Sequence, residues 1–325
     1  MIAGGPMRVA VIGDCLFDVS ARPLGPLAPG ADAPADIDLL PGGHAANVAV
    51  RLARRGVRVR LITPLADDDA AALLRRRMQA EGVELAPMPA PRTGFVLALL
   101  DDAGERTMLS SRTPLPRGVT VRHALKRQLV GVDWVHVAGQ ALADATGGAA
   151  VTAVTGALSP GVVRSVDAGS LPPDADAVAR FRERLAASRA ALLFCGRDAA
   201  SSMLGAAAKP DETLSALSAA LAASLKTGAI VTGAATGSAA SVGGHSVTVP
   251  GYARDAPVVD ATGAGDAYAA GVIVRLAGRG WPPSADELRT AMLAGSELGS
   301  RVARVRGAQT AVLGEPGLPV AVRRR

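Results

Sequence analysis

The residues whose types and spacing best suit chemistry lie in one glycine-rich stretch, VVDATGAGDAYAAG (258–271). A β-branched run ends at Asp260, and an alanine-rich helical pattern follows the glycines. A helix that begins there would turn bare backbone N–H groups toward an anion, from Gly263, Ala264 and Gly265. Asp266 falls in the first helical turn, where its carboxylate could take a proton from an attacking hydroxyl while the amides stabilise transferring phosphoryl oxygens. A second interpretation stays open, in which Asp266 only complements the helix dipole and the glycines only form a tight turn.

A second group of suitable residues lies in PGGHAANVAVRLARRG (41–56). Gly42 and Gly43 allow close backbone approach, and Asn47 projects from the helix that follows. An asparagine amide can both donate to and accept from the hydroxyls of a ligand. The alternative is that Asn47 lies on an exposed helix face with the arginines at i+4 and i+7, Arg51 and Arg54, and binds nothing.

Other kinds of phosphate and catalytic machinery are excluded. The sequence contains no G-x-x-x-x-G-K-[ST] phosphate loop, no G-x-G-x-x-G after the first strand and no G-x-S-x-G elbow. The histidines and cysteines show no metal-ligand spacing; they are His44, His123, His136, His245, Cys15 and Cys195. His136 alternates with apolar residues in a strand-like run, so we expect a core histidine.

Apolar runs and helical patterns alternate along the chain and would position these motifs. The runs are typical of strands over 7–13, 57–63, 134–139, 162–167, 191–195 and 229–232. Helical patterns cover 44–55 and 67–81, each followed by a glycine. This alternation predicts a mainly parallel sheet covered by helices on both faces.

Two segments interrupt the alternation and predict a small antiparallel lid. Residues 14–41 are rich in Pro, Gly and Asp, and 95–110 contain two apolar runs around a turn at 101–104. No linker divides the chain, so we expect one domain over 1–325 that carries these lid segments. Apolar lid residues would suit a contact between two copies of the chain, and the candidates are Phe95, Val96 and Leu97.

The composition of the 325 residues narrows the function classes further. Net charge is +6, but the arginines are scattered and only 2% of residues are aromatic, which does not favour nucleic-acid binding. We expect the arginine-rich runs at 51–60, 75–77 and 301–306 to form solvated faces. The two cysteines suit buried free thiols in a reducing compartment. MIAGGPM has no signal-peptide pattern and no apolar run is long enough to span a bilayer, so we expect a soluble cytoplasmic protein.

The order of GGHAAN followed far downstream by DATGAGDAYAAG resembles the PfkB/ribokinase family of carbohydrate and nucleoside kinases. VIGDCLFDV (11–19) is similar to the opening strand of that family, and DDAGERTML (101–109) to its lid hairpin. The resemblance implies a ribokinase-like three-layer α/β/α fold with a small antiparallel β lid. It also implies ATP-dependent, Mg²⁺-assisted phosphorylation of a hydroxymethyl group on a sugar, sugar derivative or nucleoside.

The resemblance implies roles for individual residues. Asp266 matches the catalytic base, and the anion hole matches Gly263, Ala264 and Gly265. The sugar-binding positions match Asp18, Gly42, Gly43 and Asn47. Asp260 lies where many members bind a monovalent cation such as K⁺, and the nucleotide loop contains Gly233 and Gly237.

One family motif is degenerate. The family carries N-x-x-E after the strand at 191–195, and this chain has Gly196 and Ala199 at those positions. Asp198 is the nearby acid that could replace the missing metal-supporting group. The departure leaves a non-catalytic sugar- or nucleotide-binding descendant as the alternative function. Leu16 stands where ribose-specific members often have a polar residue, which disfavours ribose as the acceptor.

Overall fold

A nine-stranded sheet lies at the centre of the computed structural model, which describes residues 7–100, 106–171, 174–205, 212–252, 257–312 and 315. Its strand order is β13-β12-β11-β10-β9-β8-β1-β4-β5. Every pairing from β11 to β5 is parallel, whereas β12 and β13 are antiparallel. The strands are β1 (Arg8–Ile12), β4 (Arg58–Leu65), β5 (Glu84–Pro89), β8 (Trp134–Ala138), β9 (Val163–Asp167), β10 (Leu192–Gly196), β11 (Gly228–Thr232), β12 (Ser238–Val242) and β13 (His245–Val249).

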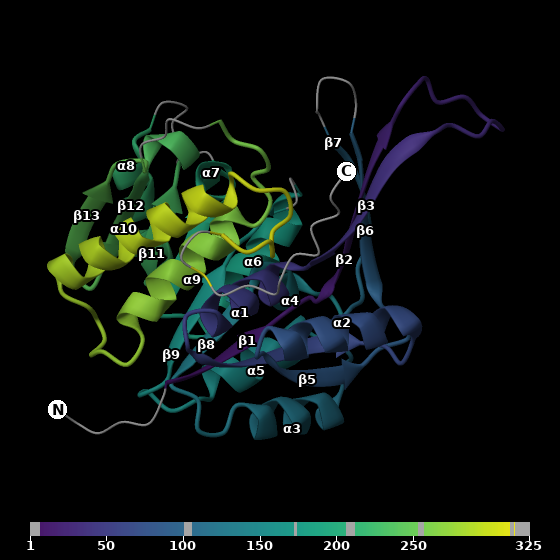
Figure 1. Cartoon of the computed structure of the whole chain (residues 1–325). Helices are drawn as coiled ribbons and strands as arrows, with labels where there is room; N and C mark the ends of the chain where they lie inside the picture. The colour runs from purple at the N-terminus through teal and green to yellow at the C-terminus, as the bar shows by residue number, and fades with distance from the viewer. Residues whose placement is uncertain are drawn as a thin grey trace.

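Helices cover both faces of this sheet because successive side chains along a strand point to opposite sides. In β1, Val9 and Val11 pack under one layer, while Ala10 and Ile12 pack under the other. The first layer contains α1 (His44–Ala53), α2 (Asp69–Ala80), α9 (Ala264–Leu276) and α10 (Ala285–Val302). The second contains α3 (Val119–Gln128), α4 (Gly139–Ala143), α5 (Gly148–Gly156), α6 (Ala175–Ala187), α7 (Arg197–Leu204) and α8 (Leu214–Leu225). The expected three-layer α/β/α arrangement is confirmed (Figure 1).

The predicted lid is a separate four-stranded sheet of order β3-β2-β6-β7. Its strands are β2 (Leu16–Pro23), β3 (Ala35–Gly42), β6 (Gly94–Leu100) and β7 (Arg106–Ser111). The two outer pairings are antiparallel and the central β2–β6 pairing is parallel. Figure 1 shows the strands β2 and β3 extending away from the helical body. The predicted turn at 101–104 lies outside the described residues.

Two arginines that we expected on a solvated helix face are buried. Arg51 is 0% exposed and Arg54 is 9% exposed. Arg51 contacts the carboxylate of Glu315, and Arg54 Nε donates to Glu81 Oε2 at 2.7 Å. The backbone carbonyls of Ala308, Gln309 and Thr310 also accept from these two guanidinium groups. The expectation was wrong because a segment distant in sequence covers this face of α1.

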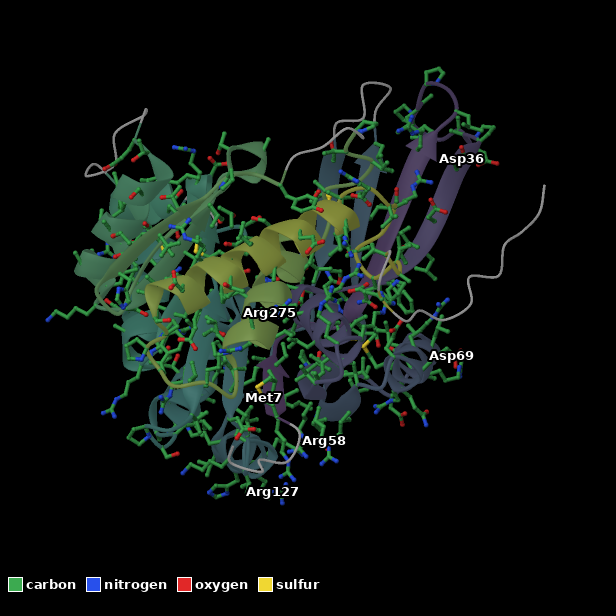
Figure 2. The ribbon with its side chains drawn as sticks, turned by 60° about the vertical axis from the view of Figure 1, so that its left-hand side comes forward. Met7, Asp36, Arg58, Asp69, Arg127 and Arg275 are labelled. Atoms are coloured by element: carbon green, nitrogen blue, oxygen red, sulfur yellow. The ribbon has the colours of Figure 1, made fainter. Side chains whose placement is uncertain are left out.

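Arg58, in the same arginine-rich run at 51–60, is exposed as expected. Arg58 and Arg127 are exposed and lie at the end of the molecule opposite to Asp36 of the lid (Figure 2). Cys15 and Cys195 are buried and free, as expected. Among the described residues, the helices are too short or too polar to cross a bilayer.

Replacing Glu315 by Gln should destabilise the fold. Three arginines, Arg51, Arg54 and Arg55, surround this buried carboxylate. Removing one partner of a buried ion pair costs about 3 kcal/mol or more. We expect urea denaturation at pH 7 to show a loss of that size. The matched change Glu297→Gln, which breaks a half-exposed pair with Arg301, should cost less than about 0.5 kcal/mol.

The deficit should also depend on pH. The pKa of Glu315 is lowered because the attraction of the arginines outweighs burial. Its stabilisation is therefore complete above the ordinary glutamate pKa and is lost as pH falls through the lowered folded value. The difference between the wild type and Glu315→Gln should shrink on acidification. Equal unfolding free energies of the two proteins at pH 7 would show that the ion pairs of Glu315 do not stabilise the fold.

Candidate active site

A cavity of about 400 Å³ opens between the body and the lid. It lies where β9, β10 and β11 end, at Asp167, Gly196 and Thr232. The carboxyl ends of parallel strands are the usual place for ligands in α/β sheets. The helices α1 and α9 begin at the same cavity, and the lid strands contribute Leu16, Asp18, Val96 and Met108. The cavity therefore gathers strand ends, two helix N-termini and the lid.

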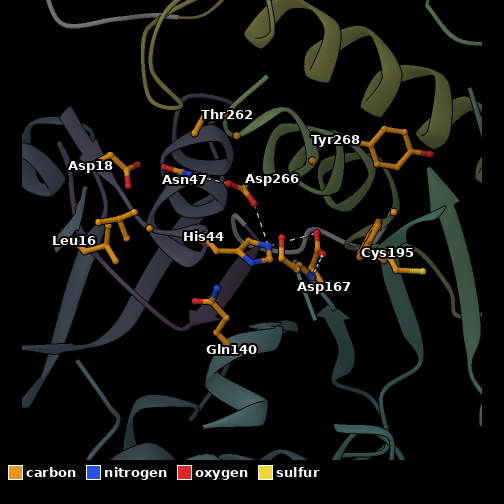
Figure 3. A pocket seen from close by; sticks show the side chains of 18 of the residues that line it. Leu16, Asp18, His44, Asn47, Gln140, Asp167, Cys195, Thr262, Asp266 and Tyr268 are labelled. Atoms are coloured by element: carbon orange, nitrogen blue, oxygen red, sulfur yellow. Dashed lines mark hydrogen bonds and ion pairs between the residues drawn. The ribbon is translucent and has the colours of Figure 1, made fainter. Parts of the chain in front are cut away.

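Asp266 lies at the centre of this cavity, in the first turn of α9 (Figure 3). Its Oδ2 accepts a hydrogen bond from Asn47 Nδ2 at 2.7 Å, and its Oδ1 lies 3.0 Å from His44 Nε2. Burial raises the pKa of Asp266 to about 6, against the opposing effects of the His44 charge and the Asn47 hydrogen bond. The two predicted motifs, far apart in sequence, thus meet at one carboxylate.

Asn47 is buried rather than exposed, so its interpretation as a solvated helix residue is wrong. Its Oδ1 accepts from Gln309 Nε2 at 3.0 Å. Because the amide oxygen is taken by Gln309, the NH₂ group must point toward Asp266. The segment that covers α1 therefore also fixes the orientation of Asn47.

The Gly-Ala-Gly stretch at the start of α9 places different demands on its two glycines. Gly263 has φ +77°, and a Cβ there would lie 2.5 Å from Ala308 Cβ. At Gly265 a Cβ would meet nothing within 4 Å. The Ala264 N–H donates to Ala261 O at 3.2 Å, whereas the Gly265 N–H finds no acceptor in the described part of the chain. One of the expected amides is thus engaged in the turn, and the Gly265 amide is available.

Asp18 and the two glycines before α1 also come together. A Cβ on Gly42 would lie only 2.0 Å from Asp18 Oδ2, so only glycine leaves this carboxylate in place. Gly43 has φ +101°, and a Cβ there would lie 2.6 Å from Asp14 O. Burial and the neighbouring Asp14 charge raise the pKa of Asp18 to about 6. Arg112 from the lid pairs with Asp14 at the cavity wall.

Some predicted site residues lie elsewhere. Asp198 is exposed on α7 and does not line the cavity, although Gly196 does. Gly233 and Gly237 flank a short 3₁₀ turn (Ala234–Thr236) beyond the cavity wall. Asp260 accepts from the backbone N–H groups of Thr262 and Gly307, each at 2.9 Å. Asp260 therefore ties the start of α9 to the carboxyl-terminal segment.

Two residues at the site were missed in the sequence, His44 and Asp167. His44 Nε2 lies 3.4 Å from Asp167 Oδ2 in addition to its contact with Asp266. Burial alone would lower the pKa of His44, but the charges of Asp266 and Asp167 raise it to about 10. The position of Asp167 at the end of a predicted parallel strand was a usable signal. For His44, the only signal in the sequence was its place directly after Gly43.

His44, Asp167 and Asp266 bring one possible metal-ligand atom each to within 4.8 Å of one another. The spacing of these residues in the sequence did not indicate this cluster. Mg²⁺ prefers oxygen donors, and a histidine nitrogen at the centre makes this a poor site for it. The 3.0 Å distance between His44 and Asp266 is that of an ion pair. His136, in contrast, is a core residue as expected, with its Nδ1 2.8 Å from Ser165 Oγ.

Comparison with known proteins agrees with this geometry. A family model described as "pfkB family carbohydrate kinase" matches residues 7–313. The chain belongs to this family. A pfkB-type chain was expected from GGHAAN and DATGAGDAYAAG, and that expectation is confirmed. A fructokinase of Escherichia coli is 27% identical over 331 residues, covering 94% of this chain and 96% of that protein.

Solved structures of pfkB-like proteins share the fold. A carbohydrate kinase of Agrobacterium tumefaciens has a TM-score of 0.71 and 20% identity, with 94% of each chain covered. A ribokinase of Thermotoga maritima has a TM-score of 0.70 and 17% identity, with 94% of this chain and 96% of that one covered. The ribokinase-like architecture is therefore shown by structure as well as by sequence.

The two glycines of the turn should differ in their tolerance of alanine. Gly263→Ala must adopt a left-handed backbone, which costs about 1–2 kcal/mol, and it also meets Ala308. Gly265→Ala stands inside α9 without a clash and should gain up to about 1 kcal/mol from helix propensity. Urea denaturation of both variants checks this. Similar stabilities for the two would show that the turn does not depend on Gly263.

Proposed function

We propose that this pfkB kinase transfers the γ-phosphoryl group of ATP to a hydroxymethyl group of a sugar, with Asp266 as the base. The observation that carries the proposal is the position of Asp266. It is a largely buried carboxylate, 14% exposed, at a helix N-terminus, beside the available amide of Gly265, in a cavity that the lid borders.

The reaction would proceed by in-line transfer. Asp18, with the backbone of Gly42 and Gly43, holds the other hydroxyls of the acceptor and leaves its hydroxymethyl group facing Asp266. The hydroxyl proton moves to the Asp266 carboxylate as the acceptor oxygen bonds to the γ-phosphorus. The bond from that phosphorus to the bridging oxygen breaks, and ADP leaves. The Gly265 amide and the N-terminus of α9 stabilise charge on the transferring oxygens.

The side chains near the cavity indicate how Mg²⁺ and K⁺ would be bound. Gly196 and Ala199 offer no side-chain ligand, and Asp198 is exposed and does not line the cavity. Mg²⁺ would therefore be held by ATP oxygens and water, which this ion tolerates. Asp260 remains our proposal for a K⁺ neighbour, since its carboxylate already organises the loops at Thr262 and Gly307 that would surround the ion.

The acceptor we propose first is a ketohexose. Relatives that align over nearly the whole chain are named fructokinases. The cavity wall offers polar side chains suited to hydroxyls, including Asp18, Asn47 and Gln140. Leu16 also lines the cavity, which agrees with the expectation that ribose is disfavoured.

Replacing Asp266 by Asn should lower kcat by roughly a hundredfold to ten-thousandfold, because the amide cannot take the proton. ADP release with fructose, other sugars and nucleosides measures this. A matched control is Asp286→Asn, an exposed first-turn aspartate of α10. If Asp266 only complemented its helix dipole, both variants would behave alike. In the wild type, kcat/KM should fall as pH drops below about 6, where Asp266 becomes protonated.

A second candidate function is a sugar- or nucleotide-binding protein without turnover. It is favoured by one observation: Gly196 and Ala199 carry no acid, and Asp198 does not line the cavity. Calorimetry on the wild type separates the two functions. A sensor would bind sugar or ATP and release no ADP at any Mg²⁺ concentration.

We also propose that two copies associate through the outer face of the lid. Strand register places Val96 toward the cavity, so only alternate residues of the predicted contact face outward. The outer face has exposed apolar side chains that a second copy would cover, namely Ile37, Leu39, Phe95 and Leu109. The cavity side of the same sheet meets the body, where Asp38 pairs with Arg306.

The double change Leu39→Glu with Leu109→Glu should therefore give a monomer. Light scattering after size exclusion measures the mass. The control is Val130→Glu, which adds a charge at an equally exposed apolar residue after α3. Dimers that survive the double change would place the contact elsewhere.

A further inference from the structure

The contact between His44 and Asp266 has no part in the transfer described above. His44 is the first residue of α1, a place where a positive charge is disfavoured by the helix dipole. It nevertheless lies between two carboxylates, 3.0 Å from Asp266 Oδ1 and 3.4 Å from Asp167 Oδ2. An imidazole nitrogen that faces two carboxylates must carry a proton. The two negative charges also raise the pKa of the ring to about 10, so the second nitrogen is protonated too and the ring is an imidazolium at neutral pH.

Both carboxylates are fixed by second partners. Asp266 Oδ2 accepts from Asn47, and Asp167 Oδ1 accepts from the backbone N–H of Gly169 at 2.9 Å. Gly169 also leaves room for the ring, since a Cβ there would lie 3.3 Å from His44 Nδ1. Each carboxylate thus presents one oxygen to the same nitrogen, while its other oxygen is held by a separate partner.

We propose that His44 is a positioning residue, a fixed cation that holds the Asp266 carboxylate charged and oriented for the acceptor, while Asp167 holds the ring. The inference rests on the proposed role of Asp266 as base. Without a nearby cation, a carboxylate as buried as Asp266 would bind a proton near neutral pH and could no longer accept one.

The charged surroundings of Asp266 decide the sign of the effect. The groups whose charges act on it are His44 of α1, Asp167 of β9 and Asp14 after β1. Asp18 of β2 also interacts electrostatically with Asp266 and Asp14. Arg112 of the lid is the nearby cation, and it pairs with Asp14. Removing His44 leaves Asp266 among like charges. Removing Asp167 takes away a like charge and leaves His44 in contact with Asp266.

The test is the pH profile of kcat/KM for the full-length wild type and three variants, with the acceptor found most active. His44→Gln should move the acidic limb upward by about one pH unit or more, so the loss of kcat/KM should approach about tenfold below pH 6 and be recovered well above neutral pH. His44→Lys, which keeps a cation, should leave the limb near its wild-type place. Asp167→Asn should not move it upward.

A uniform loss at every pH in His44→Gln, or an equal upward shift in Asp167→Asn, would overturn the inference and indicate a structural role. Asp266→Asn separates this failure from that of the proposed function. If Asp266→Asn stays fully active, the base assignment fails. If it is inactive while the limb of His44→Gln does not move, only the role of His44 fails.

A second measurement needs no variant and covers the case in which His44→Gln does not fold. The ¹⁵N chemical shifts of the His44 ring in the wild type report whether both nitrogens carry protons. We expect a doubly protonated ring at pH 8, where a free histidine is neutral. A neutral ring at that pH would overturn the inference.

Discussion

The structure depends on keeping one carboxylate charged in a place with little water. A buried charge is costly unless partners from the protein surround it, and Asp266 obtains its partners from segments far apart in sequence. His44 and Asn47, at the start of α1, contact Asp266 directly. Asp167, at the end of β9, acts on it through its contact with His44. The parallel sheet is what makes this possible, because the carboxyl ends of its strands and the N-termini of its helices meet at one edge.

The carboxyl-terminal segment, residues 307–310 and Glu315, supports the Asp266 carboxylate indirectly. Gln309 fixes the amide of Asn47, and Glu315 binds the buried arginines two and three turns along α1. Ala308 packs against Gly263 at the turn before α9, and Gly307 is tied to Asp260. The segment therefore holds α1 and the start of α9 together. A change that loosens it should disturb stability and the orientation of Asp266 at the same time.

Much of this arrangement could be predicted from residues and spacing, for clear physical reasons. The strands of the parallel sheet are continuous apolar runs, and the two glycine-rich motifs mark turns at which only glycine fits. The edge strand β5 was missed because Pro87 and Pro89 interrupt its pattern, which an edge position tolerates. The burial of Arg51 and the meeting of His44 with Asp167 could not be predicted, because both depend on contacts between distant segments.

The charge balance of the cavity connects the degenerate motif with His44. ATP brings several negative charges toward Asp266, and each uncompensated carboxylate at the site would repel them. With Gly196 and Ala199 in place of polar and acidic residues, the chain adds no further negative charge there. The imidazolium then halves the net charge of the Asp167–Asp266 pair. Compensation of these carboxylates by the protein weakens their repulsion of a polyphosphate, and among the described residues His44 is the cation in direct contact with both of them.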